Sequence, residues 1–96
     1  MVSIHYSPII EFNLAQNFPN PFNPSTIIRY AIPETQLVTL TVYNSLGEAV
    51  RELVDEVKEA GTYEIVFVAG MLTSGIYFYK LSAGEFQQTK KLILMK

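Results

Sequence analysis

The sequence predicts an all-β protein, an antiparallel sandwich of about seven strands. Short runs rich in β-branched and aromatic residues start about ten residues apart, and residues typical of turns separate them. No apolar stripe at helical spacing persists for long. With 96 residues, 49% of them hydrophobic and 17% charged, the chain is expected to form one folded domain with a single modest core.

The predicted strands follow these runs in chain order. They cover residues 26–32, 37–43, 49–54, 62–68, 75–82 and 85–95, and a shorter strand lies near residues 12–14. In the first long run Thr26, Ile28, Tyr30 and Ile32 share one face, which predicts a strand with one buried side. The run from residue 75 is apolar on both faces as far as Lys80, which favours a central strand.

Two other runs alternate in the same way as the first one. Their buried faces are expected to hold Val38, Leu40, Val42, Tyr63, Ile65 and Phe67. Turn residues close the runs at positions 33–35, 44–47, 59–61, 73–75 and 83–84. Pro33 ends the first long run because proline cannot donate a hydrogen bond in a central ladder.

The segment EAVRELVDEVK, residues 48–58, fits two interpretations. Val50, Leu53, Val54 and Val57 lie at helical spacing, yet we favour a strand to residue 54 followed by an acidic loop. The six acidic residues of positions 48–64 lack the alternating pattern of a calcium loop. We expect them to form a solvated face.

A stiff segment precedes the first long strand. Residues 17–24, NFPNPFNP, are named here the proline arm. Pro19, Pro21 and Pro24 each fix their own φ and push the preceding residue toward extended geometry. Such an arm cannot join a sheet interior, but it can lie across a sandwich edge and cover an exposed strand. Phe18 and Phe22 are expected to anchor it in the core.

Composition argues against catalysis. The chain has no cysteine, which excludes disulfides, zinc thiolate sites and thiol catalysis. His5 is the single histidine, so neither a catalytic triad nor a histidine-based metal site can be assembled. The sequence therefore predicts a non-enzyme without a cofactor. A net charge of −2 gives no pull toward nucleic acid, and no apolar run is long enough for a membrane span.

The expected domain organisation is a tail or linker remnant at residues 1–11 and one sandwich domain at residues 12–96. The first residues, MVSIHYSPIIEF, lack the basic start and the uninterrupted apolar stretch of a secretory signal peptide. If the domain is exported, we expect its export signal elsewhere in the parent protein.

The stretch LAQNFPNPFNPSTIIRYAIPE closely resembles the opening of the C-terminal sorting domains of the type IX (Por) secretion system. SGIYFYKLSAG resembles the family's fifth strand, and FQQTKKLILMK resembles its terminal strand. The block PNPFNPST followed some fifty residues later by SGIYFYKL is a specific combination, and the resemblance covers the chain from about Phe12 onward.

The resemblance implies an immunoglobulin-like sandwich that addresses an exported cargo rather than acting on a substrate. The implied partners are the outer-membrane translocon, a sortase in many family members, and the N-terminal cargo domain of the parent protein. The implied route runs through the periplasm to the cell surface or the extracellular space. Carried over from the family, the recognition residues are Pro19, Asn20, Pro21, Asn23, Pro24, Gly75, Tyr77, Lys90 and Lys91.

Plainer interpretations of these residues stay open. The proline arm can be a structural edge cover, which its packing and turn chemistry explain without any partner. Lys90 and Lys91 can be two strand residues on opposite faces, at least one of them solvated. Against this, residues 80–96 hold four lysines and only Glu85 as an acid, a positive end that suits an acidic partner.

Two other functions remain as alternatives. An accessory binding or spacer module of an extracellular enzyme, carbohydrate-binding in one version, would need an exposed row of tyrosines, with Tyr79 as the candidate. Core filling is the stronger account for most of these aromatics. The strand pattern also resembles the immunoglobulin-like module of flagellar hook-capping proteins, which implies a structural assembly module instead.

Overall fold

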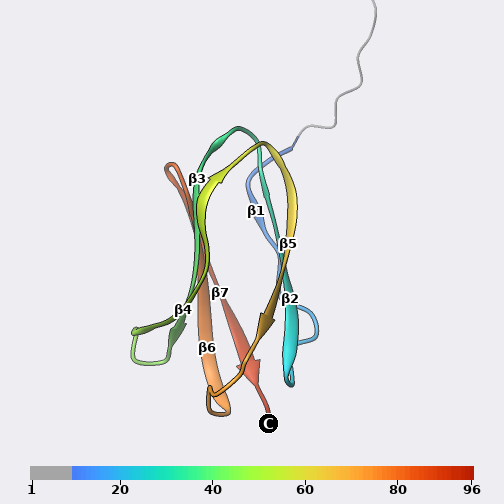
Figure 1. The fold of residues 1–96 in the computed structure, drawn as a ribbon, viewed down its shortest axis with the longest axis vertical. Helices are drawn as coiled ribbons and strands as arrows, with labels where there is room; N and C mark the ends of the chain where they lie inside the picture. Colours follow the sequence, from blue (N-terminus) through green and yellow to red (C-terminus); the bar gives the residue numbers. More distant parts are fainter. Residues whose placement is uncertain (1–9) are drawn as a thin grey trace, which may run out of the picture.

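The computed structural model describes residues 10–96, which form two antiparallel sheets packed face to face (Figure 1). Strands β1 (Asn13–Leu14), β2 (Ser25–Ile32) and β5 (Gly61–Val68) form one sheet, in the order β1-β2-β5. Strands β3 (Gln36–Asn44), β4 (Ala49–Lys58), β6 (Gly75–Ala83) and β7 (Phe86–Leu94) form the other, in the order β4-β3-β6-β7. The predicted antiparallel sandwich is confirmed.

The predicted strands match the observed ones closely. Apart from the end of β4, each predicted boundary lies within one residue of the observed boundary. Residues 1–9, with His5 and most of the predicted tail, lie outside the described residues. Within residues 10–96 there is no helix that is long and apolar enough to cross a membrane.

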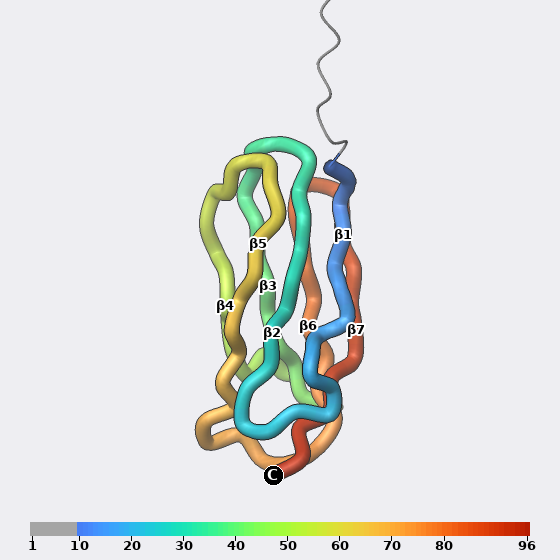
Figure 2. Tube along the Cα trace, turned by 90° about the vertical axis from the view of Figure 1, so that its right-hand side faces the viewer, coloured from blue at the N-terminus to red at the C-terminus, as the bar shows by residue number. Residues whose placement is uncertain are grey.

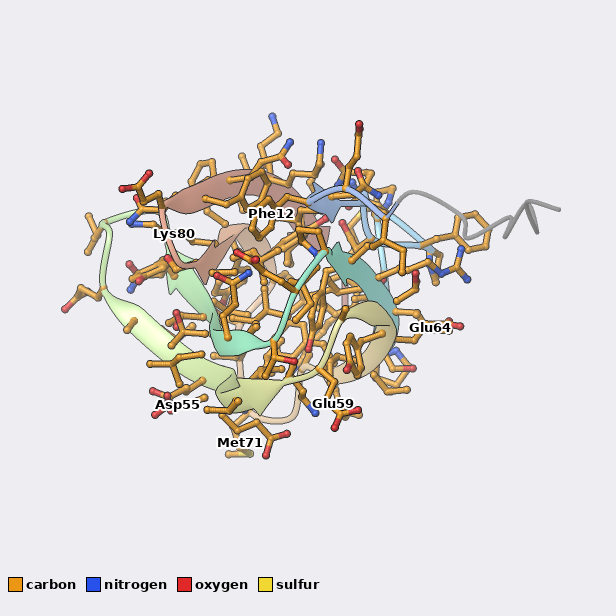
Figure 3. All side chains as sticks on the ribbon, turned by 90° about the horizontal axis from the view of Figure 1, so that it is seen from above. Phe12, Asp55, Glu59, Glu64, Met71 and Lys80 are labelled. Atoms are coloured by element: carbon orange, nitrogen blue, oxygen red, sulfur yellow. The ribbon has the colours of Figure 1, made fainter. Side chains whose placement is uncertain are left out.

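The core lies between the two sheets, where the side chains of both meet (Figure 3). On β2, Thr26, Ile28, Tyr30 and Ile32 are buried, as the alternation predicts. On β6, the buried residues alternate with half-buried ones, and the strand pairs with β3 on one side and β7 on the other. The predicted central position of this strand is therefore confirmed.

The end of β4 departs from the prediction. The strand continues to Lys58, so both the helical interpretation and the acidic loop after residue 54 are wrong. Its pairing with β3 extends to Leu37 opposite Val57, while two register shifts leave Leu53 and Val50 without a direct partner on β3. Both of these extra residues pack against the core. The two bulges disturb the period of two and place Val50 and Leu53 against the core together with Val54, whereas Val57 is 65% exposed.

Candidate recognition surface

The proline arm joins the two sheets along one side of the sandwich, beside β1 and β7 (Figure 2). Phe18 exchanges two backbone hydrogen bonds with Ile27 of β2, at 3.0 and 2.9 Å. Four residues later the Phe22 N–H donates to the Ile93 carbonyl of β7 at 2.9 Å. The Met95 N–H then donates to the Phe22 carbonyl at 3.0 Å. The arm thus starts on the three-stranded sheet and ends as a short parallel partner of β7.

Side chains extend this cover along β7, the edge strand of the four-stranded sheet. The Asn20 Oδ1 accepts a hydrogen bond from the Ile93 N–H at 2.9 Å. The Gln16 Nε2 donates to the Lys91 carbonyl at 2.7 Å. An open edge of this kind would offer its backbone groups to other chains. The predicted role of the arm as an edge cover is therefore confirmed for the carboxyl half of β7.

The two phenylalanines of the arm behave differently. Phe22 is 2% exposed and lies against Phe67 with ring centroids 5.7 Å apart, so its predicted anchoring role is confirmed. Phe18 is 79% exposed, and its predicted anchoring role is wrong. Directly opposite residues of an antiparallel pair point to the same face of a sheet. Since Phe18 pairs with the outward-facing Ile27, its side chain also lies on the outer face.

A buried hydrogen-bond network holds the start of the arm. Asn17 is 2% exposed, and its backbone N–H donates to the Tyr79 hydroxyl at 2.8 Å. That hydroxyl donates in turn to the Ala15 carbonyl at 2.7 Å. The Asn17 Nδ2 donates to the Thr26 Oγ1 at 3.0 Å, and the Thr26 hydroxyl donates to the Pro19 carbonyl at 2.8 Å. Buried networks whose groups all have partners hold a single conformation.

Burial also fixes the protonation of Tyr79. It raises the pKa of the Tyr79 hydroxyl to about 12, against an ordinary value of 10.0, and the hydrogen bond from the Asn17 N–H offsets part of this rise. The hydroxyl is therefore a neutral donor at physiological pH. The carbohydrate alternative had Tyr79 exposed, which is wrong, because the side chain is fully buried.

Sequence reasoning missed the residues that position the arm, namely Gln16, Asn17, Thr26 and Tyr79. One signal was present for Thr26, a polar residue on an otherwise apolar strand face, which indicates a buried partner. Tyr79 gave no such signal, because its partners lie more than sixty residues away in the sequence. Of the other tyrosines in the described residues, Tyr30 and Tyr77 are buried as well. No exposed row of tyrosines exists among them.

The carried-over recognition residues fall into two groups. The exposed ones are Pro19, Asn20, Pro21, Asn23, Pro24, Gly75 and Lys91. Lys90 is half-buried, and Tyr77 is 5% exposed with its hydroxyl donating to the Thr73 carbonyl at 2.6 Å. Gly75 pairs with Leu94 across the inner side of β7, whereas the arm lies along the outer side. The structure thus brings the arm and Lys91 together, and places Gly75 on the next strand.

The two adjacent lysines of β7 form no ion pair with a described carboxylate. Within residues 10–96 the ion pairs are Arg29 with Glu64, at 3.3 Å, and Lys58 with Glu56. Lys90 and Lys91 have no carboxylate at ion-pair distance in that part of the chain. The same residues contain no group of three or more acidic or histidine side chains that could hold a metal ion.

Comparison with known families assigns the chain to one of them. The model of the family described as "Secretion system C-terminal sorting domain" (Por_Secre_tail) matches residues 16–95, a range that includes the whole arm and all of β7. The chain belongs to this family. It is a C-terminal sorting domain of type IX secretion, and a domain of this kind directs its cargo to the cell surface or outside the cell. The match confirms the resemblance that the sequence predicted, and the family is one of non-catalytic signal domains.

A solved structure resembles the sorting domain in fold. The crystal structure of dimeric latent PorU from Porphyromonas gingivalis aligns with a TM-score of 0.70 and 19% sequence identity. The alignment covers 98% of this chain and 10% of that one, so the sorting domain spans about a tenth of the PorU chain. At this identity the likeness shows the shared fold alone. No curated protein matches the chain.

Proposed function

We propose that the exposed face of the proline arm and the carboxyl half of β7 form one surface, and that the outer-membrane translocon recognises it. The observation that carries this proposal is the ladder of hydrogen bonds from Gln16, Asn20 and Phe22 to β7. Because of this ladder, two segments some seventy residues apart in the sequence present their exposed groups together.

The surface is rigid before any partner binds. The prolines restrict the arm's backbone, and the Asn17–Tyr79 network fixes its start. A preformed surface loses less conformational entropy on binding than a mobile one, which favours affinity. In this proposal Pro19, Pro21 and Pro24 supply shape, and Asn23 supplies hydrogen-bonding groups.

Positive charge supplies the second part of the recognition. Lys91 is exposed beside the arm, and Lys90 lies at the same edge, both without an acidic partner in the described residues. An acidic surface on the translocon would be attracted and oriented by them. Gly75 and Tyr77 act indirectly in this proposal: Tyr77 fills the core under the strand pair, and Gly75 pairs with the end of β7.

The proposal includes a route and further partners. The folded domain, residues 12–96, follows its cargo into the periplasm, where the cargo's own N-terminal signal has delivered it. The translocon then binds the folded domain, and a sortase removes it from the cargo after passage. The domain itself performs no catalysis. Membership of a family of sorting domains supports this route.

A transport assay tests the proposal. The 96-residue chain is fused to the carboxyl end of a periplasm-directed fluorescent reporter in a type IX-competent host and in a translocon-deficient strain. We expect translocon-dependent reporter at the cell surface or in the medium. The variant Lys91→Glu should reduce this delivery strongly, whereas Lys58→Glu, the same charge change on β4, should not. Equal delivery by both variants, with both domains folded, would overturn the role given to this surface.

A further inference from the structure

The edges of the two sheets are protected unequally. The arm covers the carboxyl half of β7. The free edge of β4 is broken by two register shifts and carries a dense set of charged side chains: Arg51, Glu52, Asp55, Glu56 and Lys58. Bulges and charges of this kind keep an edge strand from pairing with other chains.

The free edge of β5 lacks these protections. Its eight residues pair with β2 in an unbroken register, and the strand contains no proline. Its one charged residue, Glu64, already forms an ion pair with Arg29 at 3.3 Å. In Figure 2, β5 lies on the side of β2 away from β1. β5 is therefore a long, regular edge that is open to strand addition.

The backbone of β5 points its unused groups outward. Val66 is the partner of Ile27, and Ile27 directs its N–H and carbonyl to Phe18 on the opposite side of β2. In an antiparallel ladder, when the N–H and carbonyl of one residue point away from the residue directly opposite, the N–H and carbonyl of that opposite residue also point away. The N–H and carbonyl of Val66 therefore face the free edge, as do those of Glu64 and Val68. Within residues 10–96 none of these groups has a hydrogen-bond partner on that side.

An apolar strip leads across the sheet to this edge. Phe18, Ile27 and Val66 lie directly opposite one another, and their exposed fractions are 79%, 42% and 64%. Val68, at 55%, lies next to Val66 on the same outer face. The strip thus ends at the strand whose backbone groups are unpaired.

We propose that two copies of this chain associate through antiparallel pairing of their β5 strands, with the two-fold axis at Val66. The strip then continues from one copy to the other, from Phe18 through both Val66 side chains to the second Phe18. Glu64 lies opposite Val68 of the other copy in this register, so no like charges meet. The pairs at Val66, and at Glu64 with Val68, each exchange two backbone hydrogen bonds across the axis.

Two registers that shift the axis toward the start of β5 are less favourable. An axis at Glu64 would place the two carboxylates directly opposite each other, which is destabilising. An axis at Ile65 would place Glu64 opposite Val66 and interrupt the apolar strip. With the axis at Val66, the sequence of β5 is complementary to itself, and this complementarity identifies a second copy as the partner.

Sedimentation of the 96-residue chain over a wide concentration range tests this association. We expect a reversible shift from the monomer mass of 10.9 kDa to twice that mass. Val66→Lys places two ammonium groups at the axis and should leave the chain monomeric. Val57→Lys is the matched control, because Val57 on β4 is 65% exposed and Val66 is 64% exposed. A wild-type chain that is monomeric throughout, or a dimer lost in the Val57 variant and kept in the Val66 variant, overturns the proposal.

A crosslinking experiment tests the register independently of any change in charge. The chain has no cysteine, so Val66→Cys and Val57→Cys each introduce a single thiol. Residues opposite each other in a hydrogen-bonded antiparallel pair have Cα atoms about 5.5 Å apart, within the range that a disulfide spans. Under mild oxidation we expect a covalent dimer from Val66→Cys and none from Val57→Cys. Equal yields from the two variants would overturn the proposed register.

Discussion

The Tyr79 hydroxyl of β6 donates a hydrogen bond of 2.7 Å to the Ala15 carbonyl, across the core and onto the other sheet. The same hydroxyl accepts the Asn17 N–H at 2.8 Å. One buried phenol therefore ties the start of the proline arm to the four-stranded sheet. The orientation of the arm depends on the interior of the sandwich, even though most of the arm is exposed.

Tyr79→Phe removes this connection and leaves the ring in place. The Ala15 carbonyl and the Asn17 N–H lose their shared partner, and leaving such groups unpaired costs about 1–3 kcal/mol. We expect the free energy of unfolding, measured by urea denaturation, to fall by that amount. An unchanged stability would contradict the network described above.

Tyr30→Phe is the matched control. Tyr30 is also fully buried, but its hydroxyl has no hydrogen-bond partner in the described part of the chain. Removing an unpaired buried hydroxyl removes a desolvation cost, so we expect this variant to be as stable as the wild type or more stable. Equal losses in the two variants would mean that lost packing, not hydrogen bonding, dominates.

High pH should weaken the fold through the same residue. Burial holds the pKa of Tyr79 at about 12 in the folded chain, against 10.0 as the ordinary value. Above pH 10 the unfolded state releases this proton while the folded state retains it, so stability falls as pH rises from about 10 to about 12. The fall should be smaller in Tyr79→Phe. Thermal melts of both proteins across this range measure the difference.

The two phenylalanines of the arm should differ sharply in their contribution to stability. Phe22→Ala empties a buried site beside Phe67 and should cost about 3–5 kcal/mol. Phe18→Ala changes a side chain that is 79% exposed and should alter stability by less than about 0.5 kcal/mol. Urea denaturation measures both. A large loss in the Phe18 variant would mean that its ring is buried after all.

The Asn20 side chain should protect one amide of β7. Its Oδ1 is the acceptor for the Ile93 N–H, so Asn20→Ala should speed hydrogen exchange at Ile93. Asn23→Ala serves as the control, because Asn23 is exposed and accepts no hydrogen bond from β7. Two-dimensional NMR measures the exchange rate of the Ile93 amide in both variants. An unchanged Ile93 rate in Asn20→Ala would contradict the edge cover.

Local patterns were sufficient to predict the sandwich. The alternation on β2 predicted the face of Ile28, and the apolar run before Lys80 predicted a central strand. The prediction for residues 48–58 was wrong at its end, and the helical alternative arose because two bulges place Val50 and Leu53 out of the period of two. Nothing in the sequence of β4 alone marks where such shifts fall, since they depend on the pairing with β3.

The site was less predictable for a similar reason. Phe18 and Phe22 are the same residue type within one short proline-rich segment, and their burial follows from the strand that each backbone pairs with. Phe18 lies opposite an outward-facing residue, and Phe22 pairs with the end of β7. Such long-range pairing is not visible in a local pattern. The Tyr79 network was missed for the same reason, because its partners are sixty-two and sixty-four positions away.

Site-specific photo-crosslinking in a type IX-competent host tests the central claim most directly, namely that the arm and β7 form one surface for one partner. A photoreactive residue replaces Pro21 in the arm, Lys91 on β7, or the control Val57 on β4, each in the reporter fusion during export. We predict that positions 21 and 91 capture the same translocon component and that position 57 does not. Capture of different components by positions 21 and 91, or by neither while the domain is folded and exported, would contradict the account.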